Sequence, residues 1–462
     1  MKTMSRYPEY KASGVKWFGH IPAHWQVHKL KHVADVQASN VDKKTEEGQS
    51  PVRLCNYVDV YYNDRITATL DFMRASATTE EMRKFLLRFG DVCVTKDSEE
   101  WNDIAVAAFV AEDIPNLLCG YHLALVRPHA NRMLGTFLAR AFSARGINDQ
   151  FRVEANGITR FGLGAGALCC GYFPVPPLVE QCAIAAFLDR ETARIDGLVA
   201  KKERLIALLQ EKRTALISHA VTKGLNSNAP MKDSGVEWLG QIPAHWECMA
   251  VKRRATRIQT GTTPPTAEPR YFEDGTVDWF GPGSFTEDLL LTQPVKRIAA
   301  SAVTEGAARM FQAGSTMIVT IGATIGKVGY ISGDGSSNQQ ITAVAFDQKR
   351  IVPKFAAYQL KRLEPVLRGI APNTTLPILD QDAVGYLPLA VPPLAEQQAI
   401  VDHIDSALAK LDALIAKIRT GIERLQEYRT ALISAAVTGK IDVRQPPASA
   451  SEVVMLVSRP GA

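Results

Sequence analysis

The chain contains one block of sequence twice: Ser13-Gly-Val-Lys-Trp-Phe-Gly-His-Ile-Pro-Ala-His-Trp25 and Ser234-Gly-Val-Glu-Trp-Leu-Gly-Gln-Ile-Pro-Ala-His-Trp246. Ten of their 13 positions are identical. We call these two stretches the Trp blocks. Gly14, Gly19 and Pro22 interrupt any regular element, so the first Trp block is predicted to be a loop with a short turn of helix.

A second repeated pair follows each Trp block at a distance. It begins at Pro176-Pro-Leu-Val-Glu-Gln181 and Pro392-Pro-Leu-Ala-Glu-Gln397. It continues without a gap to Arg213-Thr-Ala-Leu-Ile-Ser218 and Arg429-Thr-Ala-Leu-Ile-Ser434. The stretches between the Trp blocks and these segments do not match. Because solenoid repeats are only about 20–50 residues long, this pattern indicates a duplicated domain pair that carries two different inserts on one frame.

Composition is that of an ordinary globular protein. Of the 462 residues, 46% are hydrophobic and 22% are charged, and the net charge of +5 permits nucleic-acid binding without arguing for it. The seven cysteines form no CxxC pair, which is typical of reduced thiols in a cytosolic protein, so we expect a cytoplasmic location. No apolar run resembles a signal peptide or a membrane span.

Each Pro-Pro pair is predicted to open a long helix. From Ile184 and from Ile400 onward, apolar residues recur with heptad spacing, which favours a narrow packing seam. Each helix is expected to be roughly 37 residues long, or about 55 Å. A long helix with a narrow seam needs a partner, and the simplest partner is the other copy.

The inserts have short β-branched segments bounded by Gly, Pro or Asp, together with a few helical stretches. Strands are predicted at 51–60, 90–95 and 315–322, and helices at 78–87, 134–145 and 354–367. The predicted fold is therefore α+β: two globular recognition domains separated by two long helices in an antiparallel coiled coil, as a pseudo-twofold tandem repeat. The predicted segments are 1–25 with the first Trp block, 26–172 domain 1, 173–223 spacer helix 1, 224–246 linker and second Trp block, 247–388 domain 2, 389–441 spacer helix 2, and 442–462 a disordered tail.

In this order the motifs resemble one known family, the specificity subunits of type I restriction-modification enzymes. The resemblance rests on the Trp blocks, on Pro-Pro-Leu-x-Glu-Gln opening a long helix, and on the Arg-Thr-Ala-Leu-Ile-Ser ends. Within the inserts it rests on these segments: Tyr57 to Asn63, Gly90 to Ser98, Gly120 to Leu123, Thr260 to Pro264, Ile321 to Gly329, and Asn338 to Gln340. The resemblance extends over nearly the whole chain, from about Tyr7 to Val443.

The resemblance implies two domains that each read part of a double-stranded DNA site, held apart by paired helices. It also implies two methylation subunits as partners, and restriction subunits in the full complex, with no membrane association. The candidate subunit-interaction residues are Trp17, Trp25, Pro176, Glu180, Gln181, Trp238, Trp246, Pro392, Glu396 and Gln397.

No catalytic residue, cofactor or metal site is predicted. Phe161-Gly-Leu-Gly-Ala-Gly166 imitates an S-adenosylmethionine loop, but it lies at the exit of the insert. His20, His24, His28 and His32 recur every fourth residue, yet Pro22 interrupts the helix that would align them. Gly322 to Lys327 is too short for a phosphate-binding loop and lacks a following Ser or Thr.

Base edges are read by Arg, Lys, Asn or Gln, and phosphates are bound by Lys, Arg, Ser or Thr. The candidate DNA-binding residues are Lys96, Arg152, Asn156 and Arg160 in the first insert, and Lys296, Arg297, Lys327, Gln339, Gln340 and Asn373 in the second. The sequence thus predicts a non-catalytic DNA-specificity subunit. Two alternatives are a fused methyltransferase-endonuclease and a coiled-coil scaffold without a DNA role.

Overall fold

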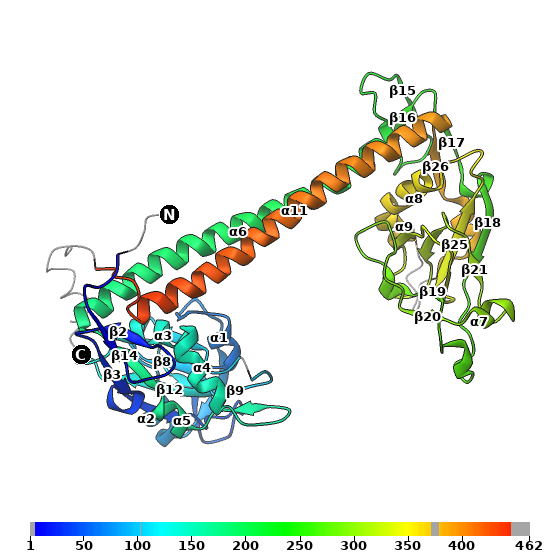
Figure 1. Ribbon diagram of the computed structural model, residues 1–462. Coiled ribbons are helices and arrows are strands. Elements are labelled where there is room, and N and C mark those ends of the chain that lie inside the picture. The colour runs from blue at the N-terminus through cyan, green and yellow to red at the C-terminus, as the bar shows by residue number, and fades with distance from the viewer. Residues whose placement is uncertain (1–4, 102, 371–377, 445–462) are drawn as a thin grey trace. The chain divides into compact units, whose positions relative to one another are not determined.

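A computed structural model describes residues 5–101, 103–370 and 378–444. The chain divides into two compact units, one formed by residues 1–202 and 419–462 and the other by 203–418 (Figure 1). The division falls within two long helices, α6 (Leu178–Lys223) and α11 (Leu394–Val437). Each unit therefore holds one globular domain and a segment of both helices. Of the expected disordered tail, 442–462, the residues from 445 onward lie outside the described residues, whereas Val443 is buried in the core of domain 1, so the expectation was wrong at the start of the tail.

The two long helices exceed the expected length. They have 46 and 44 residues instead of about 37, because each begins directly after its Pro-Pro pair and not at the first heptad position. Pro177 and Pro393 already accept backbone hydrogen bonds from Gln181 and Gln397. Proline suits a first helical turn, where its missing N–H costs nothing.

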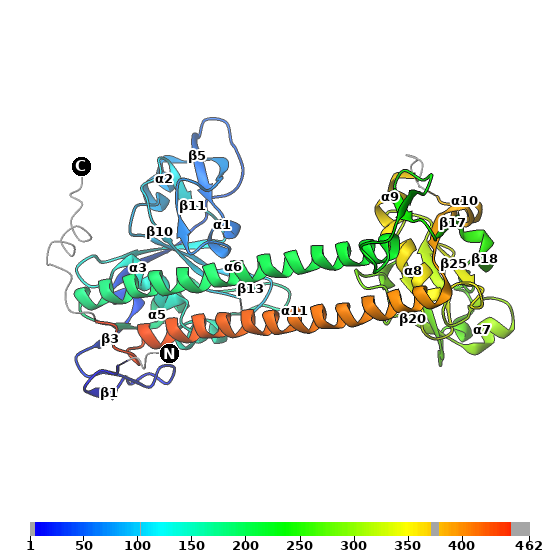
Figure 2. The same cartoon turned by 90° about the horizontal axis from the view of Figure 1, so that it is seen from above.

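Within each unit the two helix segments run side by side and antiparallel (Figure 2). In the first unit, Asp196 pairs with Arg429, and Lys202 lies beside Gly421 further along. In the second, Arg213 pairs with Asp412, and Gly224, just past the end of α6, lies beside Glu396 near the start of α11. The partner number falls as the α6 number rises, as antiparallel packing requires.

Domain 1 has two main sheets, two further two-stranded sheets (β13-β9 and β14-β3) and a helical layer. Its strands are β3 (Gln26–Lys29), β4 (Ala34–Ala38), β5 (Ser50–Cys55), β6 (Arg65–Ile66), β7 (Met73–Ala77), β8 (Val92–Thr95), β9 (Asp97–Ser98), β10 (Ala107–Val110), β11 (Leu117–Cys119), β12 (Leu123–Pro128), β13 (Phe161–Gly162) and β14 (Tyr172–Val175). Its helices are η1 (Leu30–His32), α1 (Tyr57–Tyr61), α2 (Thr79–Phe85), α3 (Gly135–Phe142), α4 (Arg145–Glu154) and α5 (Ala165–Cys170). The larger sheet has the order β4-β12-β8-β10-β6, and the smaller has β11-β5-β7.

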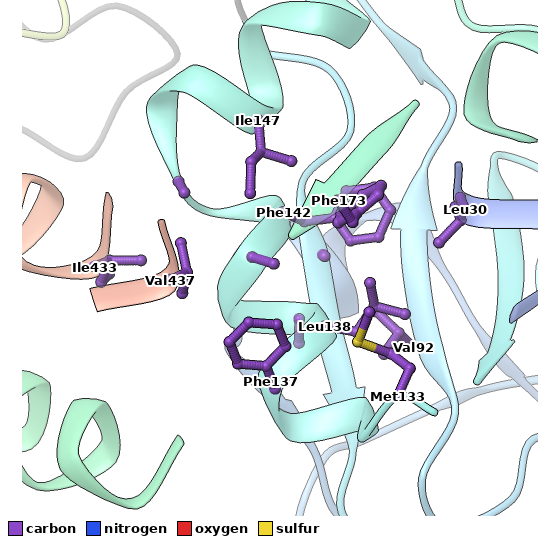
Figure 3. Close-up of a cluster of buried hydrophobic side chains, with 14 of the residues drawn as sticks. Leu30, Val92, Met133, Phe137, Leu138, Phe142, Ile147, Phe173, Ile433 and Val437 are labelled. Atoms are coloured by element: carbon purple, nitrogen blue, oxygen red, sulfur yellow. The ribbon is translucent and has the colours of Figure 1, made fainter. Parts of the chain in front are cut away.

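Strand β8 lies at the centre of the larger sheet and serves two cores, because successive side chains point to opposite faces. Val92 and Val94 join the core under α3, and Cys93 joins the core that faces the smaller sheet. Figure 3 shows the first of these cores, in which Phe137 and Phe142 of α3 lie near Val437 of α11. The far end of the chain therefore helps to bury domain 1.

Domain 2 repeats this layering with a different sequence. Its strands are β17 (Glu247–Ala250), β18 (Ala255–Thr260), β19 (Val277–Phe280), β20 (Lys296–Ile298), β21 (Met310–Phe311), β22 (Thr316–Val319), β23 (Val328–Tyr330), β24 (Gly335–Ser337), β25 (Ile341–Phe346) and β26 (Pro388–Val391). Its helices are η2 (Val251–Arg253), η3 (Pro269–Tyr271), η4 (Pro282–Ser284), α7 (Ala300–Thr304), α8 (Pro353–Arg362), α9 (Glu364–Ile370) and α10 (Gln381–Tyr386). Sheets β18-β25-β22-β23 and β20-β19-β24-β21 enclose a core that includes Phe280, Met317 and Ile341. The expected α+β fold is confirmed.

The Trp blocks differ from their prediction. Strands β1 (Tyr10–Ala12) and β2 (His20–Pro22) form an antiparallel hairpin, and β15 (Met231–Asp233) and β16 (Gln241–Pro243) repeat it. Gly14 and Gly19 have positive φ angles of +74° and +63°, which glycine adopts without strain. Both residues lie in the turn that connects the two strands. Between the strands, the Gly19 N–H donates to the Val15 carbonyl oxygen at 3.3 Å, which forms the predicted helical turn. The strand His20–Pro22 was missed, because it is too short to show an alternating pattern.

Three other predicted elements are divided in the structure. The expected strand at 51–60 ends at Cys55, and α1 follows, with Asn56 and Asp59 forming a capping box. The expected helix at 134–145 becomes α3 and the start of α4. The expected helix at 354–367 becomes α8 and α9. In each case the apolar run is short and contains no residue that marks where one element ends and the next begins.

Candidate nucleic-acid interface

A polar cluster forms in domain 1 where β8 ends. Lys96 follows this strand, and its Nζ lies 3.5 Å from Asp97 Oδ2 and 4.7 Å from the ring centre of Tyr121. His122 Nδ1 lies 3.0 Å from the same Asp97 oxygen. The segments 90–98 and 120–123, which are separate in the sequence, therefore meet at one place.

A tight hairpin, residues 156–162, adds Arg160 to this cluster. Asn156 and Gly162 exchange two backbone hydrogen bonds of 3.1 and 2.8 Å, and Arg160 Nη2 lies 3.3 Å from His122 Nδ1. Gly157 has φ +149°, and a Cβ there would lie 1.9 Å from the carbonyl oxygen of Arg160, so the turn requires glycine. The tip residue, Ile158, is 95% exposed.

The structure thus brings together Lys96, Asn156 and Arg160 from the four predicted residues of domain 1. Arg152 stands apart on α4, where its Nη1 pairs with Asp149 at 3.2 Å. That ion pair occupies the guanidinium, so Arg152 is the weakest of the four as a DNA contact.

Sequence reasoning missed several aromatic side chains of domain 1 that are partly or fully exposed. Tyr57 and Tyr61 stack on α1 with ring centres 5.3 Å apart, and Tyr62 beside them is 77% exposed. Asp103 accepts a hydrogen bond from Tyr61, which raises the pKa of that phenol to about 12. Trp101 is also exposed. Aromatic residues interleaved with Lys and Arg are typical of nucleic-acid surfaces, and their clustering in 57–62 was the available signal.

In domain 2 the three motif segments converge on Gln340. Asn338 Nδ2 donates to Gln340 Oε1 at 3.0 Å, and Gln340 Nε2 lies 3.5 Å from the carbonyl oxygen of Ile321. The neighbouring Gln339 is exposed and accepts a hydrogen bond from the Thr263 hydroxyl. Gln339 and Gln340 therefore sit on a cluster of uncharged hydrogen-bonding groups, unlike the charged cluster of domain 1.

Threonine hydroxyls extend this second cluster. Thr342 Oγ1 lies 3.0 Å from Thr260 Oγ1 and 3.1 Å from Thr320 Oγ1. Gln381 Nε2 donates to Thr260 Oγ1 at 2.9 Å. A Cβ on Gly261 would lie 2.2 Å from Ser337 Oγ, so glycine lets the 260–264 loop approach the 337–340 loop closely.

The other candidates of domain 2 lie elsewhere. Lys327 Nζ donates to the carbonyl oxygen of Phe285 at 3.1 Å, which directs it inward. Lys296 lies over Phe272 and Trp279, and Arg297 Nε pairs with Asp278 Oδ1 at 2.8 Å. Asn373 lies outside the described residues.

Among the candidate subunit-interaction residues, several are used inside the chain. Trp25 Nε1 and Tyr7 Oη donate to Glu180 Oε2 at 2.9 and 3.1 Å, and His24 Nε2 lies 2.6 Å from Glu180 Oε1. The second unit repeats the contact, because Trp246 Nε1 donates to Glu396 Oε1 at 3.1 Å. These contacts fasten each Trp block to the start of a long helix.

Gln181 and Gln397 are both buried and play one role. Gln181 donates to the carbonyl oxygen of Pro176 and accepts from the backbone N–H of Leu134 at 2.8 Å. Gln397 donates to the carbonyl oxygen of Pro392 and accepts from the N–H of Val352 at 2.7 Å. Each amide joins a long helix to the start of α3 or α8.

Trp17 and Trp238 remain partly exposed, at 38% and 41%.

Two further searches of the described residues gave no site. No group of three or more His, Cys, Asp or Glu side chains there could hold a metal ion. Among these same residues, no helix has the length and apolarity needed to cross a membrane.

One part of the chain matches the model of a known protein family. Residues 255–424 match the family model of the type I restriction modification DNA specificity domain. This match covers less than half of the chain. It is similar to the MjaVIII specificity subunit of Methanocaldococcus jannaschii, with 24% identity over 59% of this chain and 62% of that protein. The match thus spans less than two thirds of that relative's length. The EcoBI specificity subunit of Escherichia coli is 26% identical over 22% of each chain.

Solved structures share the fold of this chain. A chain from a study of complex assembly and conformational transition of the type I R-M system has a TM-score of 0.69, with 19% identity, over 91% of this chain and 99% of that one. The HsdS subunit from Thermoanaerobacter tengcongensis has a TM-score of 0.55 and 18% identity over 91% and 98%. The family model covers most of domain 2 and part of α11.

Proposed function

We propose that this protein is the non-catalytic DNA sequence-specificity subunit of a type I restriction-modification complex. Each domain reads one half of a bipartite, asymmetric double-stranded DNA site. The subunit acts with no cofactor of its own, and methylation and restriction belong to separate subunits. Because its proposed substrate is DNA, we expect it to act in the cytoplasm.

The observation that carries this proposal is one frame with two different polar surfaces. Domain 1 presents Lys96, Asn156 and Arg160, and domain 2 presents Gln339 and Gln340. Arg and Lys favour guanine edges and phosphates, whereas Gln and Asn favour adenine. Because the two surfaces differ in chemistry, the two domains are suited to read different base sequences.

Partner subunits are proposed to dock on the repeated frame. It occurs twice, so it offers two equivalent sites for two methylation subunits, with restriction subunits added in the full complex. Trp17 and Trp238 are exposed at equivalent positions of the two Trp blocks and are suited to anchor such contacts. The other candidate residues make contacts inside the chain that hold this surface in place. They include Trp25, Glu180, Gln181, Trp246, Glu396 and Gln397.

An electrophoretic shift assay tests the proposal. The chain is combined with its methylation subunit and mixed with duplexes carrying the sites that methylome sequencing of the source organism identifies. We expect selective binding of these duplexes, tighter by about 10³-fold or more than binding of unrelated DNA. Methyl transfer by the isolated chain would instead favour a fused enzyme, and equal binding of all duplexes would favour a scaffold.

Domain exchange tests the assignment of half-sites. Replacing residues 26–172 with the first insert of another family member should change one half of the recognised sequence only. If both halves changed together, the assignment of one domain to one half-site would be wrong.

A further inference from the structure

Arg429 connects three elements of the first unit. Its Nη2 donates to Asp64 Oδ2 of domain 1 at 2.8 Å, and its Nε donates to Asp196 Oδ1 of α6 at 3.0 Å. The arginine itself belongs to α11. One guanidinium therefore joins the recognition domain to both long helices.

Arg213 makes the same connection in the second unit. Its Nη2 donates to Asp288 Oδ1 of domain 2 and its Nη1 donates to Asp412 Oδ1 of α11, both at 2.6 Å. We call Asp64–Arg429–Asp196 and Asp288–Arg213–Asp412 the arginine clamps. The side chains of Arg429 and Arg213 are 26% and 19% exposed, whereas their aspartate partners are 49–62% exposed, so these charge-assisted bonds are partly screened by solvent.

The position of the clamps in the sequence is informative. Each arginine opens a repeated Arg-Thr-Ala-Leu-Ile-Ser segment, and each belongs to the helix of the opposite repeat. Asp64 and Asp288 come from the inserts, which do not match. Two surface loops of different sequence thus each supply a carboxylate to an equivalent arginine. This indicates that each repeated helix needs a bond from its arginine to the domain beside it.

Each domain also has a second attachment, to its own helix. Arg140 of α3 donates to Asp189 Oδ1 at 2.9 Å and to Asp64 Oδ2 at 2.7 Å. In the second unit, Lys354 and Tyr358 each donate to Asp405 at 2.6 Å. Apolar packing also holds domain 1 against α11, through Ile433 and Val437, but such packing is not directional. The clamp adds directional bonds, and these restrict the tilt of the domain on the two helices.

We propose that Arg213 and Arg429 are positioning residues that set the selectivity for the length of the DNA spacer. This inference rests on the proposed function. When both domains keep a fixed tilt on their helices, only one spacer length presents both half-sites in register. Loss of a clamp lets one domain rock, so sites with a neighbouring spacer length are bound better.

The test uses the complex with methylation subunits and three duplexes that share the methylome-derived half-sites. Their spacers have the native length, one base pair fewer and one base pair more. The wild-type complex should prefer the native spacer by about 10–100-fold, the cost of a poorly placed contact. Arg429→Ala and Arg213→Ala should each reduce that preference several-fold. Discrimination against a mismatch in the half-site read by the other domain should stay unchanged.

Arg204→Ala is the matched control, because Arg204 is an exposed arginine of α6 with a loose 4.0 Å pair to Glu211. If Arg429→Ala does not fold, Arg429→Lys retains the charge but not the two-sided donation, and it should show a smaller loss of preference.

Unchanged spacer preference in folded Arg429 and Arg213 variants would overturn the inference. So would an equal loss in the Arg204 control. If the wild-type complex bound none of the duplexes selectively, the proposed function itself would fail. The two failures are therefore distinguishable.

Discussion

Trp25 donates its indole N–H to Glu180, a residue at the start of the long helix α6, and Trp246 repeats this bond to Glu396. Glu180 is 8% exposed and also accepts from Tyr7. The burial of Tyr7 and the nearby carboxylate both raise the pKa of its phenol, so it remains a neutral donor. A buried carboxylate with several donors is costly to remove.

We therefore expect Glu180→Ala to destabilise the first Trp block by about 1–3 kcal/mol, because two donors lose their acceptor inside the protein. Hydrogen exchange of residues 20–25 measures this local loss. Glu203→Ala, which changes an exposed glutamate of the same helix, is the control and should leave this exchange unchanged. Equal protection in both variants would contradict the structural role.

Acid should loosen the first arginine clamp. Burial by itself raises the pKa of Asp64, but Arg140 and Arg429 outweigh it and hold the pKa below its ordinary value. An acid with a lowered folded-state pKa stabilises the protein above its unfolded pKa, about 4, and loses this contribution as the pH falls through its folded value. Below about pH 4, hydrogen exchange near residue 64 should therefore accelerate. Asp64→Asn should remove that acid-dependent step, and its persistence would mean that another group titrates.

Single substitutions should separate the two reading surfaces. Gln339→Ala should relax one base position in one half-site, at about 1–3 kcal/mol. Arg160→Ala should weaken only the half-site read by domain 1. Binding to a panel of singly mismatched duplexes checks both. A uniform weakening across all sequences, with a flatter salt dependence, would instead assign the residue to the phosphates.

The length of the long helices should set the spacing between the two half-sites. Inserting four residues near Ala200 lengthens α6 by about 6 Å, at 1.5 Å per residue. With a rise of about 3.4 Å per base pair, the gap between half-sites should grow by one or two base pairs. Methylome mapping of the variant checks this. An unchanged gap in an active variant would show that something other than the helices sets the spacing.

Thiol reactivity should follow burial. Cys55, Cys93 and Cys119 are buried together in domain 1, whereas Cys170 is exposed. A neighbouring thiol and burial both raise the pKa of Cys55, and burial raises that of Cys119. In the native protein a thiol reagent should therefore modify Cys170 first, and the three buried cysteines only after unfolding. Peptide mass mapping tests the order, and early modification of Cys93 would contradict it.

The sequence by itself determined the frame. Repetition located the Trp blocks and the two long helices, because identity at matching positions does not depend on local propensity. The heptad spacing predicted the helices. The pattern begins only at Ile184, so the prediction missed the first helical turns after Pro177. The α+β class of the inserts followed from their short strands. It could also be predicted that Lys96 and Gln339 lie in motif-bearing segments.

Only the tertiary structure decided which of these residues meet. Arg160 reaches Lys96 through His122 and Asp97, and these four residues come from three separate segments. Asp64 and Arg429 lie 365 positions apart, and nothing in either local sequence marks the other as a partner. Lys327 looked free to bind DNA, yet it donates to Phe285. Local patterns encode backbone periodicity, whereas contacts between distant side chains depend on how the packed layers bring chain segments together.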